Sequence, residues 1–156
     1  MSDHPFASIF PDYLQGRRTR DLIEHHSEIM LALGLLGGRA SRNFNPTEIM
    51  IGPLEKVVRH ATLMLTMLGV EDPLALYIDE FEAAKAKHPG HTFDLPDVPN
   101  SSKYWGLAEE AGEVAAALTY DNADSTGHQA DLIKEITQVG GLALAWLTCC
   151  QDGGER

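Results

Sequence analysis

The chain has 156 residues, and its 23 acidic and 12 basic side chains give a formal net charge of −11. That length fits one domain with its own core, and a hydrophobic content of 44% is typical of a globular protein. The charge is uneven, because residues 1–70 carry seven acids and seven bases, whereas residues 71–156 carry the whole excess. We therefore expect no nucleic-acid partner, which would require clustered Lys and Arg. Acidity of this kind suits a hard cation better.

The sequence also bears on the cellular compartment. No apolar run reaches the roughly 20 residues that a membrane span needs. The N-terminus lacks the basic and apolar regions of a signal peptide. The two cysteines, Cys149 and Cys150, are adjacent, so they suit neither a disulfide framework nor a zinc site. We expect a cytoplasmic protein that makes no membrane contact.

Helical periodicity runs through most of the chain, and no long segment alternates with the period of a strand. Residues 1–18 hold two prolines and a glycine and are expected to form an irregular arm. The expected helices cover residues 19–36 (before Gly37 and Gly38), 53–68 (beginning at Gly52-Pro53), 73–87 (capped by Asp72), 102–120 (capped by Ser101 or Ser102) and 129–149. The sequence thus predicts an all-α bundle in one structural domain, with helices of residues 19–87 packing on residues 88–156.

Two polar pairs stand beside the apolar stripes of the last two expected helices. On a helical wheel, Glu110 and Glu113 share one edge of the first stripe, and Glu135 and Gln138 take the matching edge of the second. On the same wheel, Asp131 lies at an angle between Glu135 and Gln138, one turn earlier in the helix. If the two helices pack antiparallel, the three glutamates converge, with Asp131 within reach.

Three converging carboxylates repel one another unless a cation neutralises them. Oxygen ligands favour Mg²⁺, or Mn²⁺, over zinc, and such a cation in turn binds phosphate oxygens. The chain has no Glu-x-x-His pair on these helices, which disfavours a di-iron carboxylate bundle. The alternative is that the acids form an ordinary solvated face, as i, i+3 acidic pairs often do. The matched pair on the second helix argues against that alternative.

The stretches LAEEAGEVAAAL and LIKEITQVGGLALAWL together resemble the MazG-like family of all-α nucleoside triphosphate pyrophosphohydrolases. That family carries Glu-x-x-Glu on one helix and Glu-x-x-Asp on the next. Here Glu110 and Glu113 match the first pair and Glu135 matches the second glutamate, while Gln138 stands where the family has aspartate. The resemblance covers residues 85–150. It implies a four-helix bundle and Mg²⁺-dependent cleavage of a nucleoside triphosphate into a monophosphate and pyrophosphate.

The resemblance also implies roles for individual residues. Glu110, Glu113 and Glu135 would be the catalytic metal ligands; Gln138 would bind through its carbonyl, and Asp131 would replace the missing carboxylate. Lys103 and Lys134 are candidate phosphate contacts and Trp105 a candidate base contact, although solvated lysines and a core tryptophan are the ordinary alternatives. Bundles of this type often dimerise, so we expect a homodimer or a higher homo-oligomer.

The neutral half resembles the acidic half in its pattern. Residues 22–33 align with residues 107–118, and residues 54–65 with residues 132–143. The four ligand positions then read His25, Glu28, Val57 and His60. Residues 19–69 are thus either a degenerate repeat that has lost its metal site or a pair of amphipathic helices that resemble the other pair by coincidence.

The sequence is compatible with several functions. The leading expectation is a nucleotide pyrophosphohydrolase, with phosphoribosyl-ATP pyrophosphohydrolase as a related helical alternative. Gln138 favours a second class, a MazG-like module that binds a nucleotide or a protein with little or no turnover. Plain helical oligomerisation is a third. The pattern does not name the base or the sugar.

Overall fold

The computed structural model describes residues 21–41, 48–119 and 128–152. They form five helices: α1 (Leu22–Ala40), α2 (Glu48–Met67), α3 (Pro73–Lys87), α4 (Asn100–Thr119) and α6 (His128–Asp152). No strand occurs within these ranges, so the predicted all-α class is confirmed. The arm expected over residues 1–18 lies outside the described residues. No helix in the described ranges combines the length and the hydropathy that a membrane crossing requires.

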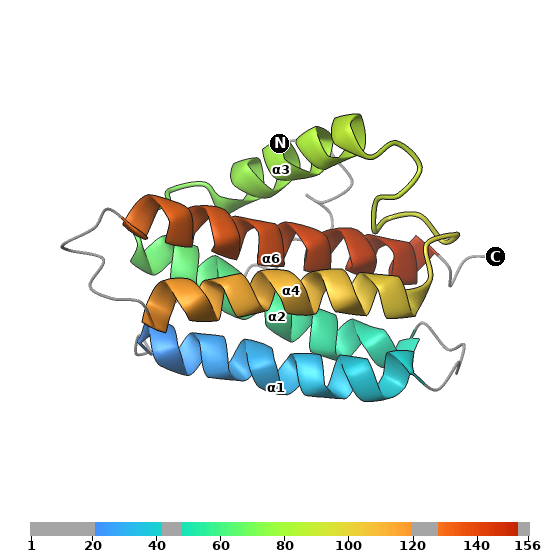
Figure 1. Cartoon of the computed structure of the whole chain (residues 1–156), viewed down its shortest axis with the longest axis horizontal. Helices are drawn as coiled ribbons and strands as arrows, with labels where there is room; N and C mark the ends of the chain where they lie inside the picture. The colour runs from blue at the N-terminus through green and yellow to red at the C-terminus, as the bar shows by residue number, and fades with distance from the viewer. Residues whose placement is uncertain (1–20, 42–47, 120–127, 153–156) are drawn as a thin grey trace.

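Four of the helices pack side by side as a bundle. The neighbouring pairs are α1 with α2, α2 with α6, α6 with α4, and α4 with α1. The two helices of each pair run antiparallel (Figure 1). Their apolar stripes meet in a single core that includes Leu36, Leu54, Leu107, Ile136 and Trp146. Exchanging α1 and α2 with α4 and α6 leaves this pattern of neighbours unchanged, as an internal repeat would require.

Helix α3 lies outside the bundle and packs on α6 (Figure 1). Its anchor is Tyr77, which is fully buried and shares a hydrogen bond of 3.0 Å with the hydroxyl of Thr62 on α2. The ring lies so close to Gly140 that a Cβ there would collide with it. The absence of a side chain at Gly140 therefore allows α3 to pack closely on α6, and this contact fixes the position of α3.

The C-terminal end of α1 and the N-terminal end of α2 both differ from the sequence-based prediction. Helix α1 continues through Gly37 to Ala40. The missing side chain of Gly37 makes room for the ring of Tyr104, whose nearest atom lies 2.6 Å from the position of a Cβ, so this glycine serves packing and does not end the helix. Helix α2 begins at Glu48, so Pro53 lies inside it. Proline cannot donate to the carbonyl of Ile49, and Arg39 donates to that carbonyl instead. This contact allows α2 to begin before the proline, within what was predicted as a loop.

The remaining ends follow local capping chemistry. The prediction for α3 is confirmed, with the Asp72 side chain accepting from the amide of Ala75 at 3.0 Å. Helix α4 begins earlier than predicted: the amide of Lys103 already donates to the carbonyl of Pro99. Ser101 and Ser102 therefore lie within its first turn and the prediction that one of them caps the helix is wrong. Helix α6 extends three residues beyond its predicted end.

Candidate metal centre and adjoining cavity

The acidic cluster forms where α4 and α6 pass each other. Glu110 and Glu113 come from successive turns of α4, and Glu135 comes from the facing edge of α6. One carboxylate oxygen from each of the three lies within 4.8 Å of the others. The predicted convergence of these three residues is therefore confirmed. Glu110 and Glu135 are partly buried, and Glu113 is exposed, so the cluster opens to solvent on one side.

Burial and mutual repulsion both act on the cluster. Partial burial, followed by the neighbouring charges of Glu113 and Glu135, raises the pKa of Glu110 to about 7. Burial also raises the pKa of Glu135, and a hydrogen bond with Glu113 adds to that shift. Near neutral pH the cluster thus holds protons that ordinary glutamates have lost. A divalent cation would relieve the same repulsion by displacing those protons.

Gln138 completes the cluster from the next turn of α6. With its amide nitrogen facing inward, it donates to Oε2 of Glu135 at 2.6 Å and to Oε2 of Glu110 at 3.1 Å. Rotation of the amide by half a turn would present the carbonyl oxygen at the same place, as a fourth oxygen ligand. One side chain can thus stabilise the carboxylates without a cation and bind a cation when one is present.

A backbone contact holds the acidic turn of α4 in position. The Nε2 atom of His26, on α1, donates to the carbonyl of Ala111 at 2.9 Å. Ala111 is fully buried and directly follows Glu110. The bundle therefore fixes the backbone that carries Glu110, while the carboxylates themselves remain at the edge of the core.

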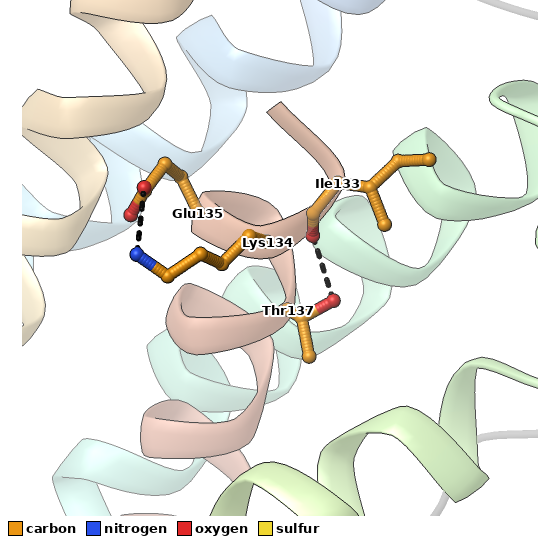
Figure 2. A network of polar contacts seen from close by, with 4 residues as sticks. All are labelled: Ile133, Lys134, Glu135 and Thr137. Carbon is orange, nitrogen blue, oxygen red and sulfur yellow. Dashed lines mark hydrogen bonds and ion pairs between the residues drawn. The ribbon is translucent and has the colours of Figure 1, made fainter. Parts of the chain in front are cut away.

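The lysines predicted to bind phosphate have different surroundings. Lys134 is exposed, and its Nζ lies 3.5 Å from Oε1 of Glu135 (Figure 2). The attraction of Glu135 raises the pKa of Lys134, so its charge stays beside the cluster. Lys103 is 1% exposed and donates to the sulfur of Cys149 at 3.2 Å, a place that offers no open phosphate site. Its predicted role gains no support from this placement.

Two other predicted site residues do not join the cluster. Trp105 is 69% exposed and lies beside α1, next to Gly34 and Gly38, rather than among the glutamates. Asp131 belongs to the first turn of α6, and its side chain lies outside the described part of the chain. Its role as a substitute ligand stays a prediction.

A cavity of about 340 Å³ adjoins the cluster, and no local sequence pattern predicts it. Glu110 and Gln138 form one wall, and α3, the turn after it and α6 form the others. The lining includes the apolar side chains Phe81, Phe93 and Leu142 and the polar side chains Lys87, His88, His91 and Thr92. The signal that was available is the chain order, since the turn at Pro89-Gly90 brings α3 and α4 to the same end of α6. Only the packing shows the cavity.

The opposite half of the bundle has a histidine pair at the corresponding place. Nδ1 of His25 lies 3.0 Å from Nδ1 of His60, and both side chains are buried. The alignment of the two halves sets His25 against Glu110 and His60 against Gln138, so corresponding residues touch in both halves. Val57 stands at the position of Glu135 and is fully buried. The repeat stays a prediction, which this correspondence of contacts supports.

No family model, curated protein or solved structure matches the chain.

Proposed function

We propose that the protein is a nucleotide pyrophosphohydrolase that uses Mg²⁺, or Mn²⁺, and cleaves a nucleoside triphosphate into a monophosphate and pyrophosphate. The observation that carries the proposal is the three-carboxylate cluster, with its oxygens within 4.8 Å of one another, beside a cavity of about 340 Å³ that Glu110 helps to line. The resemblance of residues 85–150 to MazG-like proteins supports the same assignment.

The donor set fits a hard cation. All four candidate ligands, Glu110, Glu113, Glu135 and Gln138, offer oxygen. Burial, followed by the charges of Glu113 and Glu135, raises the pKa of Glu110, and a bound cation would offset both effects. A bound Mg²⁺ would supply charge neutralisation on the phosphates and an acidified water. Lys134 holds Glu135 at one edge of the site and leaves a positive charge near the place where phosphates would lie.

The cavity suits the nucleoside part of the substrate. Its volume of about 340 Å³ falls within the range of small-molecule pockets, and its apolar lining can hold a planar base. The tip of the Phe93 ring abuts Gly106, where a Cβ would lie 2.7 Å from Cζ, so the missing side chain leaves room for the ring. Lys87, His88 and His91 line the cavity and are exposed, so they can meet anionic groups. We assign the base to the Phe93 side and the phosphates to the Glu110 side.

One observation favours a second candidate, a nucleotide-binding module without turnover. Gln138 replaces the aspartate of the family pattern, and its amide nitrogen can satisfy both Glu110 and Glu135 without any cation. A cluster stabilised in this way gains less free energy from binding a cation. Both candidates share the nucleotide site and differ only in catalysis.

A pyrophosphate-release assay separates the two candidates. The full chain is incubated with a panel of ribonucleoside and deoxyribonucleoside triphosphates and Mg²⁺ or Mn²⁺. We expect release with at least one nucleotide, a loss of at least about 100-fold with Glu113→Gln, and near-normal release with Glu109→Gln, which alters an exposed carboxylate outside the cluster. Nucleotide binding without release would favour the binding module, and neither binding nor release would refute both.

A further inference from the structure

The outer side of α1 carries an apolar surface that no other described element covers. Among the described residues, the exposed large hydrophobic side chains are Ile23, Met30, Leu31, Leu35, Met67 and Trp105. All but Met67 belong to α1 or to the adjacent turn of α4. On α1 they project within an arc of about 140°, together with Ser27, Gly34 and Gly38, and exposed Glu24 near the start of the helix falls within the same arc. We name this region the α1 outer surface: Ile23, Ser27, Met30, Leu31, Gly34, Leu35, Gly38 and Trp105.

Gly34 and Gly38 differ from the glycine between them. A Cβ at Gly37 would collide with Tyr104, so the bundle itself requires that glycine. A Cβ at Gly34 or Gly38 would meet nothing within 4 Å. These two glycines instead help to line a hollow of about 260 Å³ between α1 and Trp105. The α1 outer surface therefore has a trough beside protruding leucines.

We propose that the α1 outer surface is the contact face of a homodimer, in which α1 of one chain packs antiparallel on α1 of a second copy. A two-fold interface must be complementary to itself. This surface meets that requirement, because the side chains of Leu31 and Leu35 protrude and the trough at Gly34 and Gly38 lies on the same face. A two-fold axis near Gly34 brings the leucines of each copy over the trough of the other.

The size and the charge of the surface both favour a second copy. Its large side chains, each 46–69% exposed, present on the order of 600 Å² of area, close to the roughly 800 Å² that each partner contributes to a stable interface. Glu24 is the one charged residue of α1 within this arc, and it lies at the N-terminal end of the helix, although the chain carries −11. A basic partner would find a single acid of α1 to pair with, at the end of the surface, whereas a second copy offers a matching apolar face across its middle.

Sedimentation equilibrium of the full chain tests the proposal. We expect a concentration-dependent change from 17.1 kDa to twice that mass. We expect dimerisation to tighten when salt is raised from about 0.05 to 0.5 M, because screening weakens the repulsion between two acidic chains. The double variant Leu31→Glu/Leu35→Glu should weaken dimerisation at least about 100-fold, since it would bury four like charges at one interface. Met67→Glu, on α2, should leave it unchanged within about twofold.

Far-UV circular dichroism confirms that each variant keeps its helices. The proposal is wrong if the wild-type chain stays monomeric to about 200 µM, a concentration that detects even weak dimers. It is also wrong if a dimer forms that ignores the Leu31→Glu/Leu35→Glu change. Acrylamide quenching of tryptophan fluorescence, with Trp105→Phe to isolate the signal of Trp105, reports whether Trp105 is accessible to solvent. If the chain is monomeric and Trp105 is not quenched, another part of the same chain covers the α1 outer surface, and the homodimer proposal is wrong.

Discussion

Cation binding should release protons from the glutamate cluster, and Glu110 sets the size of the effect. Its pKa of about 7 means that Glu110 is about 90% protonated at pH 6, half protonated at pH 7 and about 10% protonated at pH 8. Because a cation binds only the ionised carboxylate, apparent affinity should rise about tenfold between pH 6 and pH 8. About half a proton should leave Glu110 per cation at pH 7, and the raised pKa of Glu135 adds to that number.

Isothermal titration calorimetry with Mn²⁺ measures this release directly. The observed enthalpy is plotted against the ionisation enthalpy of several buffers, and the slope gives the protons released per cation. Glu110→Gln should lower the slope and flatten the dependence on pH. Glu109→Gln should change the slope only slightly, because Glu109 raises the pKa of Glu110 less than burial, Glu113 and Glu135 do. A zero slope at pH 7, or an affinity that does not change between pH 6 and pH 8, would refute the reasoning.

The remaining predictions concern stability. In the absence of divalent cations, the difference in melting temperature between the wild-type chain and Glu110→Gln should decrease as the pH rises from about 4.5 to about 7. The reason is that the folded chain binds the proton of Glu110 more tightly than the unfolded chain does, so this contribution to stability is lost as Glu110 ionises. An increase over the same range would contradict this. Gly140→Ala should destabilise by about 1–3 kcal/mol in urea through its collision with Tyr77, whereas Gly112→Ala, which has open space, should not. Arg39→Met should cost about 1–2 kcal/mol by leaving a carbonyl of α2 without a donor, and an unchanged urea midpoint would show that the contact contributes nothing.

The fold class and the cluster were predictable because both follow from periodicity. Apolar spacing located all five described helices, and the wheel positions of Glu110, Glu113 and Glu135 required only that α4 and α6 pack antiparallel. The start of α2 was not predictable in this way. It depends on Arg39 reaching a carbonyl ten residues along the chain, and a tertiary contact of that kind leaves no local pattern.

The cavity and the position of α3 were hidden for a similar reason. Tyr77 looks like one more apolar residue of an amphipathic helix, and Gly140 like a weak point in another. Only their contact shows that α3 is held against α6 and encloses the space beside Glu110 and Gln138. Lys103 illustrates the converse case, because a lysine near an acidic motif suggests a ligand contact, yet its buried amine lies against Cys149 and its predicted role gains no support.

The arrangement of the two helix pairs within one chain has a consequence for how such a protein can change over time. When a bundle is assembled from two identical chains, each mutation enters both halves at once, so neither half can lose a ligand without the other. Here α1–α2 and α4–α6 are encoded separately. The pair of His25 and His60 can therefore vary without altering Glu110 and Gln138, and selection can act on stability in one half and on chemistry in the other.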